Sequence, residues 1–443
     1  MKRTFSVLLF VCILASLLLL SSCSASFSDA IGSLGGGYKD SAPDMDMSYG
    51  ESYAPSDGSE GDYSDGATGD ETSPELPNNA PVKLPAGMMT AGAWNDNTYY
   101  SDWAAHIAKN GKFQGYYDDV ELTWGFNSSD RVKVTVRNGE GPVAGATVEA
   151  YDDDSKPAFR AVTDAEGNAY LFPSLKSGTI AVYNGEEKAT AAFDEQTRVL
   201  EVELATESEK LNVVEIMLVV DVTGSMSDEL YFLKAELADV INRIAANDSE
   251  TVINLAMLFY RDHGDKVPFD YYDFTDVTNA EGLAKQQAAL DKQSATGGGD
   301  YPEAVDEALE MAVNKQWSTG ATTKIIFHVL DAPAHDDKTN KAKLTESVEK
   351  AAELGIRICP IICSGAAEST EYTMREAAVY TGGTFIFVTD DSGIGGGHHD
   401  PNLPNATVEL LNSLMVRLVK GYHSGTFDEP IYWRQDPNLG SAN

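Results

Sequence analysis

The stretch Asp221-Val222-Thr223-Gly224-Ser225-Met226-Ser227 determines the interpretation of the largest part of this chain. The residues before it, 213–220, are apolar except for Glu215, which is typical of a buried parallel strand. Leucine and isoleucine recur after it at spacings of three and four, which predicts an amphipathic helix. The motif is therefore expected to form a turn at the carboxyl end of a strand, where open α/β sheets bind ligands. Its carboxylate and two alternate hydroxyls are hard oxygen donors, suited to Mg²⁺ or Ca²⁺.

Two further loops carry residues that would complete such a site. Thr296 lies in the glycine-rich stretch 294–300, before a predicted helix with a proline in its first turn. Asp331 ends the apolar run 325–330. The three loops together resemble the metal-ion-dependent adhesion site of the von Willebrand factor A (VWA) domain. The alternative, a turn that only caps a helix, explains the first loop but not all three.

The resemblance implies a role for each residue of the motif. Asp221, Ser225 and Thr296 would bind the ion directly or through water, and Thr223 and Asp331 would complete the shell or orient its waters. The expected ion is Mg²⁺, with Mn²⁺ or Ca²⁺ as alternatives. A dication held by only two carboxylates stays electrophilic, so an acidic residue of a protein ligand would fill its open position. Thr223 stands where serine is commoner, and Asp331 is followed by Ala-Pro rather than the frequent glycine.

Alternating strand and helix patterns over residues 211–424 predict a doubly wound α/β sheet, which is the fold that the VWA resemblance implies. The expected strands are 213–220, 252–260, 268–273, 324–330, 356–363 and 384–388. The expected helices are 227–245, 279–290, 302–315, 341–354, 370–380 and 406–421. Residues 425–443 form a tail with no assignment.

Residues 126–206 are predicted to form a small all-β sandwich, because short alternating segments such as 132–136 are separated by turn signals. The stretches Gly-Pro-Val-Ala-Gly-Ala-Thr-Val at 141–148 and Thr-Asp-Ala-Glu-Gly-Asn-Ala-Tyr-Leu-Phe at 163–172 resemble carboxypeptidase-regulatory, transthyretin-like modules. The resemblance implies a spacer or a carbohydrate- or protein-contact module. The fold class is therefore multidomain, with a Rossmann-like VWA domain, a β sandwich and an N-terminal tether.

Residues 81–125 contain several tryptophan and tyrosine anchors, among them Trp94 and Trp103. Aromatic anchors at this density imply packing against another surface. The segment is interpreted as a strap packed on the next domain, and a ligand-binding aromatic surface is the alternative.

The first 22 residues have a basic head and an apolar stretch, as a secretory signal peptide does. The ending Leu20-Ser21-Ser22-Cys23 resembles the lipobox of bacterial lipoproteins, which implies lipidation of Cys23. An uncleaved anchor is the alternative, but the apolar stretch is shorter than a span of about 20 residues. Residues 23–80 are sparse in apolar side chains and are predicted to be a disordered acidic tether. The expected location is extracytoplasmic, at the cell surface or periplasmic face.

The chain of 443 residues has a formal net charge of −37, which argues against nucleic acid and anionic membrane surfaces as partners. Cys359 and Cys363 are interpreted as buried small hydrophobes. His398 and His399 would suit a transition metal, but no partner stands at a recognisable spacing.

These features predict a surface lipoprotein that binds a protein, matrix or envelope ligand through the metal site. An architectural lipoprotein whose metal only stabilises the fold is the alternative. A metal-dependent hydrolase is disfavoured, because the sequence contains neither Gly-x-Ser-x-Gly nor His-Glu-x-x-His nor a phosphate-binding Gly-Lys-Ser/Thr loop. A haloacid-dehalogenase-type phosphohydrolase would need a second aspartate where Thr223 stands. The protein is therefore not expected to be an enzyme.

Overall fold

A computed structural model describes residues 85–118, 125–206, 210–246, 250–319, 321–401, 403 and 406–440. All of them belong to one compact unit, Asn79–Asn443. The predicted signal peptide, the Cys23 lipidation site and the tether lie outside the described residues. Among the residues described, no helix is long and apolar enough to span a membrane.

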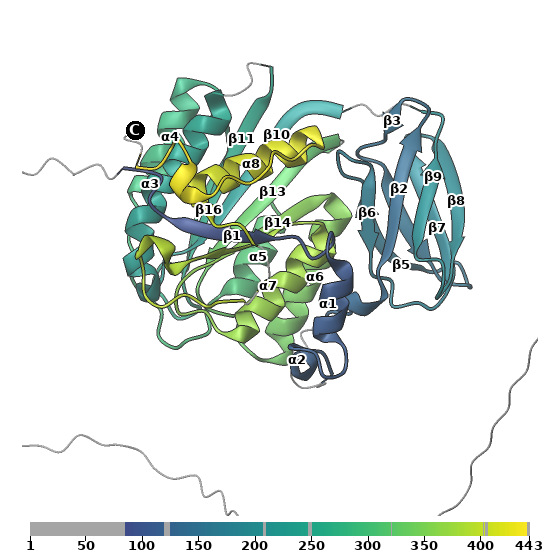
Figure 1. The fold of residues 1–443 in the computed structure, drawn as a ribbon, viewed down its shortest axis with the longest axis horizontal. Coiled ribbons are helices and arrows are strands. Elements are labelled where there is room, and N and C mark those ends of the chain that lie inside the picture. Colours follow the sequence, from purple (N-terminus) through teal and green to yellow (C-terminus); the bar gives the residue numbers. More distant parts are fainter. Residues whose placement is uncertain are drawn as a thin grey trace, which may run out of the picture. The chain divides into compact units, whose positions relative to one another are not determined.

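An eight-stranded sheet forms the centre of the α/β part (Figure 1). Its strands, in order across the sheet, are β12 (Phe269–Asp276), β11 (Val252–Tyr260), β10 (Lys210–Asp221), β13 (Ala321–Leu330), β14 (Ile356–Ile362), β15 (Phe385–Val388), β1 (Thr90–Trp94) and β16 (Glu409–Leu410). The five strands from β11 to β15 in this order are parallel to one another, and β12 is antiparallel to β11. All six strands predicted from the apolar runs occur in this sheet, which confirms the mixed α/β architecture.

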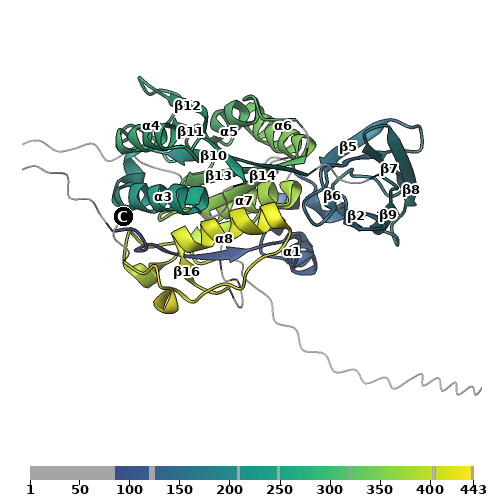
Figure 2. The ribbon, with the colours of Figure 1, turned by 90° about the horizontal axis from the view of Figure 1, so that it is seen from above.

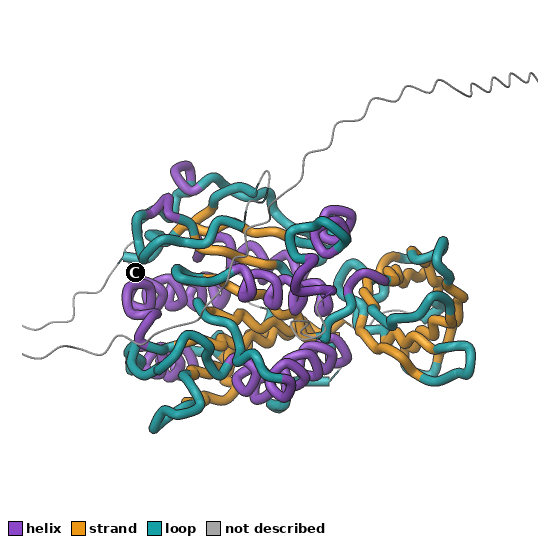
Figure 3. The backbone as a smooth tube through the Cα atoms, turned by 90° about the horizontal axis from the view of Figure 1, so that it is seen from below, coloured by secondary structure: helices purple, strands orange, loops and turns teal. Residues whose placement is uncertain are grey.

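Helices cover both faces of the sheet (Figures 2 and 3). They are α3 (Ser227–Ala246), α4 (Ala280–Asp291), α5 (Val305–Val313), α6 (Lys338–Leu354), α7 (Glu368–Thr381) and α8 (Leu411–Ser424). Helices α3, α4 and α8 share a core with Leu218 and Val220 of β10. Helices α5, α6 and α7 share a core with Met217 and Val219, which point to the opposite face. Burial on both faces explains why β10 has an almost continuous apolar sequence.

The order in which the chain forms the strands reverses between β10 and β13. The parallel neighbours of β10 are β11 on one side and β13 on the other. After β10 the chain continues to β11, toward one edge of the sheet, and after β13 it continues to β14, toward the other edge. Such a reversal point is where doubly wound sheets bind their ligands.

Strand β1 comes from the aromatic-rich segment that precedes the β sheets in the sequence. It lies antiparallel between β15 and β16 and so completes the main sheet, beside α8 (Figure 1). Gly92 faces the ring of Phe387, and a Cβ atom at this position would lie 2.3 Å from the ring Cζ. Pairing with β1 also holds Glu409 and Leu410 in extended conformation, so α8 begins at Leu411 rather than at the predicted residue 406.

The residues after β1 are fixed to α7 by a buried ion pair. Asp96 accepts two hydrogen bonds from Arg375, at 2.8 Å to Nε and 2.5 Å to Nη2. Arg375 is fully buried, and its Nη1 donates to Glu371 at 3.0 Å. Trp103, in α1 (Tyr100–Ile107), is also fully buried and lies 4.9 Å from the guanidinium. This segment, which continues into α2 (Gln114–Asp118), therefore packs on a helix of the main sheet.

Two four-stranded sheets provide the strands expected between residues 126 and 206. One contains β3 (Gly141–Pro142), β2 (Val132–Asn138), β6 (Asn168–Leu171) and β9 (Val199–Glu203). The other has the order β5 (Pro157–Val162), β4 (Thr147–Tyr151), β7 (Gly178–Asn184) and β8 (Glu187–Phe193). Phe159 of β5 and Phe172, which directly follows β6, pack on Tyr380 of α7, with ring centroids 5.8 and 4.5 Å away. Their apolar core is thus continuous with that of the main sheet.

Glu376 of α7 is expected to make stability depend on pH. Burial raises its pKa to about 8, although the Ser128 hydroxyl donates to it at 2.9 Å. The pKa in the unfolded chain is lower, so ionisation of Glu376 opposes folding. This penalty is absent below about pH 4.5, grows by about 1.4 kcal/mol per pH unit and is complete near pH 8.

Glu376→Gln should therefore raise the melting temperature at pH 8 and change it little at pH 4.5. Glu346→Gln, at an exposed site of α6, is the control. Equal shifts at both pH values would argue against the buried acid.

Candidate metal centre

Asp221 is the last residue of β10 and is fully buried. Its Oδ1 accepts hydrogen bonds from the backbone N–H of Thr223 at 2.9 Å and from the Thr223 hydroxyl at 2.7 Å. The Thr223 hydroxyl oxygen lies 3.1 Å from Oγ of Ser225. The other oxygen of Asp221, Oδ2, is buried and has no hydrogen-bond partner among the described residues. Because such an oxygen is costly to bury, a bound cation would stabilise it.

The glycine-rich loop lies directly beside this turn. Thr296 donates its N–H to the carbonyl of Val222 at 3.0 Å, and Gly224 donates to the carbonyl of Gly297 at 3.1 Å. Gly297 has a φ of 86°, which favours glycine at this position. The side chains of Ser225 and Thr296 belong to exposed residues, whereas Asp221 is buried. The site therefore has a buried carboxylate at its base and hydroxyls at its solvent side.

Two side chains from the loop after β11 hold the glycine-rich loop in place. Arg261 donates from Nε to the carbonyl of Thr296 at 2.8 Å and from Nη2 to that of Ser294 at 3.2 Å. Asp265 accepts the N–H of Gly298 at 3.0 Å. The loops after β10 and β11 and the loop before α5 thus form one hydrogen-bonded framework.

Asp331 follows β13 directly and is 3 % exposed. Val220 of β10 pairs with Val329 of β13, so the two aspartates leave the sheet at the same edge. Burial, followed by the negative charge of Asp331, raises the pKa of Asp221 to about 7. The structure thus brings all five predicted residues to one edge: three in the first turn, Thr296 by backbone bonding, and Asp331 from the adjacent strand.

Glu303 is a further carboxylate at this edge that the sequence analysis does not include. It precedes α5, and its Oε1 lies 2.8 Å from the position that a Cβ on Gly298 would occupy. Burial, and then the charge of Asp221, raises the pKa of Glu303 to about 9, with Asp331 also contributing. The sequence does carry a signal for this residue, which is an acidic side chain between the glycine-rich loop and the helix. From the sequence, residues 302–315 are assigned only to a helix, and Glu303 is given no role in the site.

The donor set fits a hard dication. Asp221, Glu303 and Asp331 are all buried and repel one another, and Arg261 is a cation whose charge favours ionised Asp221. Like charges that share a site cannot all ionise without a compensating cation. Carboxylates and hydroxyls are the ligands that Mg²⁺ and Ca²⁺ prefer.

One protein-family model matches part of this chain. Residues 215–390 match the family model of the von Willebrand factor A domain. The matched VWA segment runs from β10 to the end of β15 and includes Asp221, Thr296 and Asp331. No curated protein matches the chain.

Several solved structures show a distant likeness. BatB from Bacteroides thetaiotaomicron is 14% identical with a TM-score of 0.30, over 39% of this chain and 89% of that chain. The pilus adhesin SpaC from Lactobacillus rhamnosus GG is 10% identical with a TM-score of 0.36, over 65% of this chain and 35% of that chain. An aerotolerance-related membrane protein from Bacteroides fragilis NCTC 9343 is 12% identical with a TM-score of 0.25, over 51% and 93%. At these scores the likenesses carry no argument about this chain.

The other candidates from the sequence analysis lie outside the five-residue site, although Nε2 of His398 is 3.3 Å from Oε1 of Glu229 in the first turn of α3. His398 contacts Asp390, with Nδ1 2.7 Å from Oδ1, whereas His399 contacts Glu371, with Nε2 2.6 Å from Oε2. The two histidines therefore do not converge on one ion. Cys359 and Cys363 are buried and are not joined in a disulfide, as expected.

Proposed function

We propose that this protein binds a protein ligand through a dication held at the carboxyl edge of the main sheet. Asp221, Ser225 and Thr296 would bind the ion directly or through water, with Thr223 and Asp331 completing the shell. Mg²⁺ is the proposed ion, and Mn²⁺ or Ca²⁺ are alternatives. The observation that carries the proposal is the unpartnered Oδ2 of Asp221 beside other buried carboxylates.

The arrangement of burial supports a binding role for the ion. The carboxylates lie on the protein side of the site, whereas Ser225 and Thr296 are exposed. When bound, the ion supplies an electrophilic position that an Asp or Glu of the ligand completes. An architectural role, in which the ion only offsets the repulsion between Asp221, Glu303 and Asp331, is the second candidate.

We also propose that the protein is a lipoprotein anchored to a membrane through Cys23 on its extracytoplasmic side. The basic, apolar and Cys-terminated pattern of residues 1–23 supports this placement. Residues 126–206 would then be a carboxypeptidase-regulatory-like spacer next to the VWA segment. Incorporation of labelled palmitate into the wild-type chain, and its loss in Cys23→Ala, is the corresponding measurement.

The role of the ion can be tested by selecting displayed peptides on the purified protein in Mg²⁺. The selected peptides should be enriched in Asp or Glu and should elute with chelator. Replacing the acidic residue by its amide should weaken binding by about 10–100-fold, the usual range for a charge-assisted contact of 1.5–3 kcal/mol.

Ser225→Ala should weaken the same peptides, whereas Ser101→Ala, at an exposed position of α1, should not. Peptides that bind equally well in chelator, or that show no preference for acidic residues, would favour the architectural role instead.

A further inference from the structure

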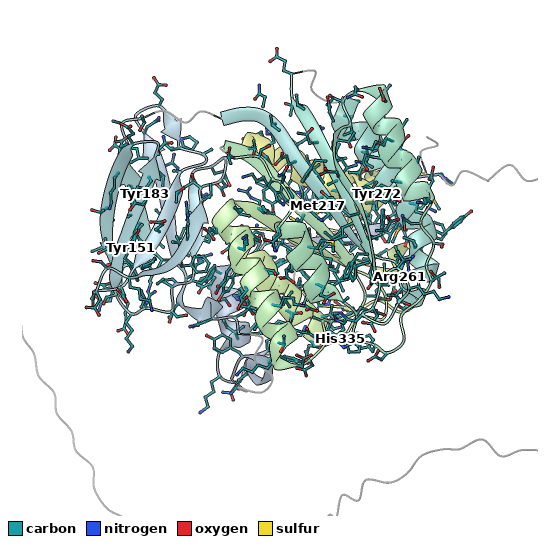
Figure 4. All side chains as sticks on the ribbon, turned by 180° about the vertical axis from the view of Figure 1, so that it is seen from behind. Tyr151, Tyr183, Met217, Arg261, Tyr272 and His335 are labelled. Atoms are coloured by element: carbon teal, nitrogen blue, oxygen red, sulfur yellow. The ribbon has the colours of Figure 1, made fainter. Side chains whose placement is uncertain are left out.

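A second cluster of metal-ligating side chains lies in the two loops that follow β11 and β13, the strands on either side of β10. Asp262 and His263 follow β11, and His335 lies in the loop after β13. Nε2 of His335 is 2.7 Å from Oδ1 of Asp262, and the two histidine rings have centroids 4.9 Å apart. One ligand atom from each residue can be chosen so that all three lie within 4.8 Å of one another. In Figure 4, His335 and Arg261, which precedes Asp262, lie at the same end of the main sheet.

Two carboxylates of α5 lie close to the ring nitrogens of His263. Its Nε2 is 3.8 Å from Oδ1 of Asp306, and its Nδ1 is 3.4 Å from Oε2 of Glu307. Asp306 is fully buried, and Lys343 of α6 lies 3.1 Å from its other oxygen. Histidines that bind metals in proteins commonly direct their second nitrogen to a carboxylate, which fixes the ring and increases its basicity. Either nitrogen of His263 can therefore bind an ion while the other faces a carboxylate.

We propose that Asp262, His263 and His335 form a second metal site, which takes a transition-metal ion of the Zn²⁺ class. Imidazole nitrogens suit Zn²⁺ and related ions, whereas the Asp221 centre offers only oxygen. Two histidines and one carboxylate leave a fourth position for water or for a donor from a ligand.

An ion at this position would join the loops that build the Asp221 centre. The loop after β11 supplies Arg261 and Asp265 to the glycine-rich loop, and the loop after β13 begins with Asp331. Among the described residues, backbone hydrogen bonds link these loops through the start of α5, where Glu303 donates to the carbonyl of Pro333 at 3.0 Å and Ala304 donates to the carbonyl of Arg261 at 3.4 Å. A metal held by Asp262 and His335 would replace their hydrogen bond with coordinate bonds and so strengthen the direct link between the two loops.

The test is titration of the purified full-length protein with Co²⁺ in excess Mg²⁺, followed by displacement with Zn²⁺. One equivalent of Co²⁺ should bind and give the visible absorption of a tetrahedral site, and Zn²⁺ should remove it. His335→Gln keeps a side-chain donor for Asp262 but loses the imidazole ligand. It should therefore fold normally and lower the Zn²⁺ affinity by more than about 100-fold, beyond the 10–100-fold that loss of an outer partner costs. Glu307→Gln should lie within that smaller range.

His399→Gln is the matched control, because it removes a histidine outside the cluster. Asp221→Ala should retain Zn²⁺ binding, which separates this site from the Mg²⁺ centre. The proposal is overturned if Co²⁺ does not bind, if His335→Gln and Asp262→Asn bind Zn²⁺ as the wild type does, or if His399→Gln removes binding. In each of those cases, the contact between His335 and Asp262 would be only a hydrogen bond between loops.

Discussion

Asp221→Ala is expected to abolish Mg²⁺ binding. The substitution removes the carboxylate at the base of the centre and both hydrogen bonds that orient Thr223. Calorimetric titration with Mg²⁺, Mn²⁺ and Ca²⁺ should therefore show binding to the wild type and none to the variant. Because one lost charge-assisted contact already costs 1.5–3 kcal/mol, the affinity should fall at least about 10–100-fold.

Asp153→Ala is the matched control for this titration. Asp153 is an exposed aspartate in the turn between β4 and β5 and should leave Mg²⁺ binding unchanged. Circular dichroism of both variants checks that the fold is retained. Metal binding that survives Asp221→Ala would place the ion elsewhere, and a wild type that binds no dication would leave an architectural protein.

Asp96→Ala is expected to destabilise the fold by about 3–5 kcal/mol, because it leaves a buried arginine with only part of its charge compensated. Arg375 is fully buried and, among the described residues, would keep Glu371, 3.0 Å away, as its ion-pair partner. The free energy of unfolding, measured by denaturant titration, gives the effect directly.

Two further variants identify the cause. Asp102→Ala, at an exposed position in the first turn of α1, should cost no more than about 1 kcal/mol. Asp96→Ala combined with Arg375→Met should recover part of the loss, since the unpaired guanidinium is gone. A loss below about 1 kcal/mol for Asp96→Ala alone would show that this pair does not anchor the segment after β1.

The main sheet could be predicted because its strands are continuous apolar runs that follow one another in the sequence. Residues 213–220 and 325–330 lie within β10 and β13, two adjacent parallel strands. Parallel strands end at the same edge, so Asp221 and Asp331 are close in space although far apart in the sequence. The helices α3 and α6 follow from the same periodicity and end within a few residues of their predicted limits.

Strand β1 could not be predicted in the same way. Thr90-Ala91-Gly92-Ala93-Trp94 consists mostly of small residues and has no apolar run, and its partners β15 and β16 lie far along the chain. Its small side chains fit the ring of Phe387, which only the structure shows. The aromatic anchors did indicate packing, but they did not indicate the surface to which the segment binds.

Contacts between side chains of different loops could not be predicted from the sequence either. Glu303 belongs to the carboxylate cluster only because the start of α5 bonds to the loop after β13. The ring of His335 contacts Asp262, which lies in the loop after a different strand. Neither contact has a spacing that a single sequence reveals.

The most direct measurement is the anomalous difference density of a crystal of the protein grown with Mn²⁺. The proposed centre predicts a peak at the carboxyl edge of the main sheet, in contact with Ser225 or Thr296 and beside Asp221. The peak should be absent from crystals of Asp221→Ala grown in the same way. A wild-type crystal with no peak at this edge, or with its Mn²⁺ at another place in the chain, would contradict the metal centre.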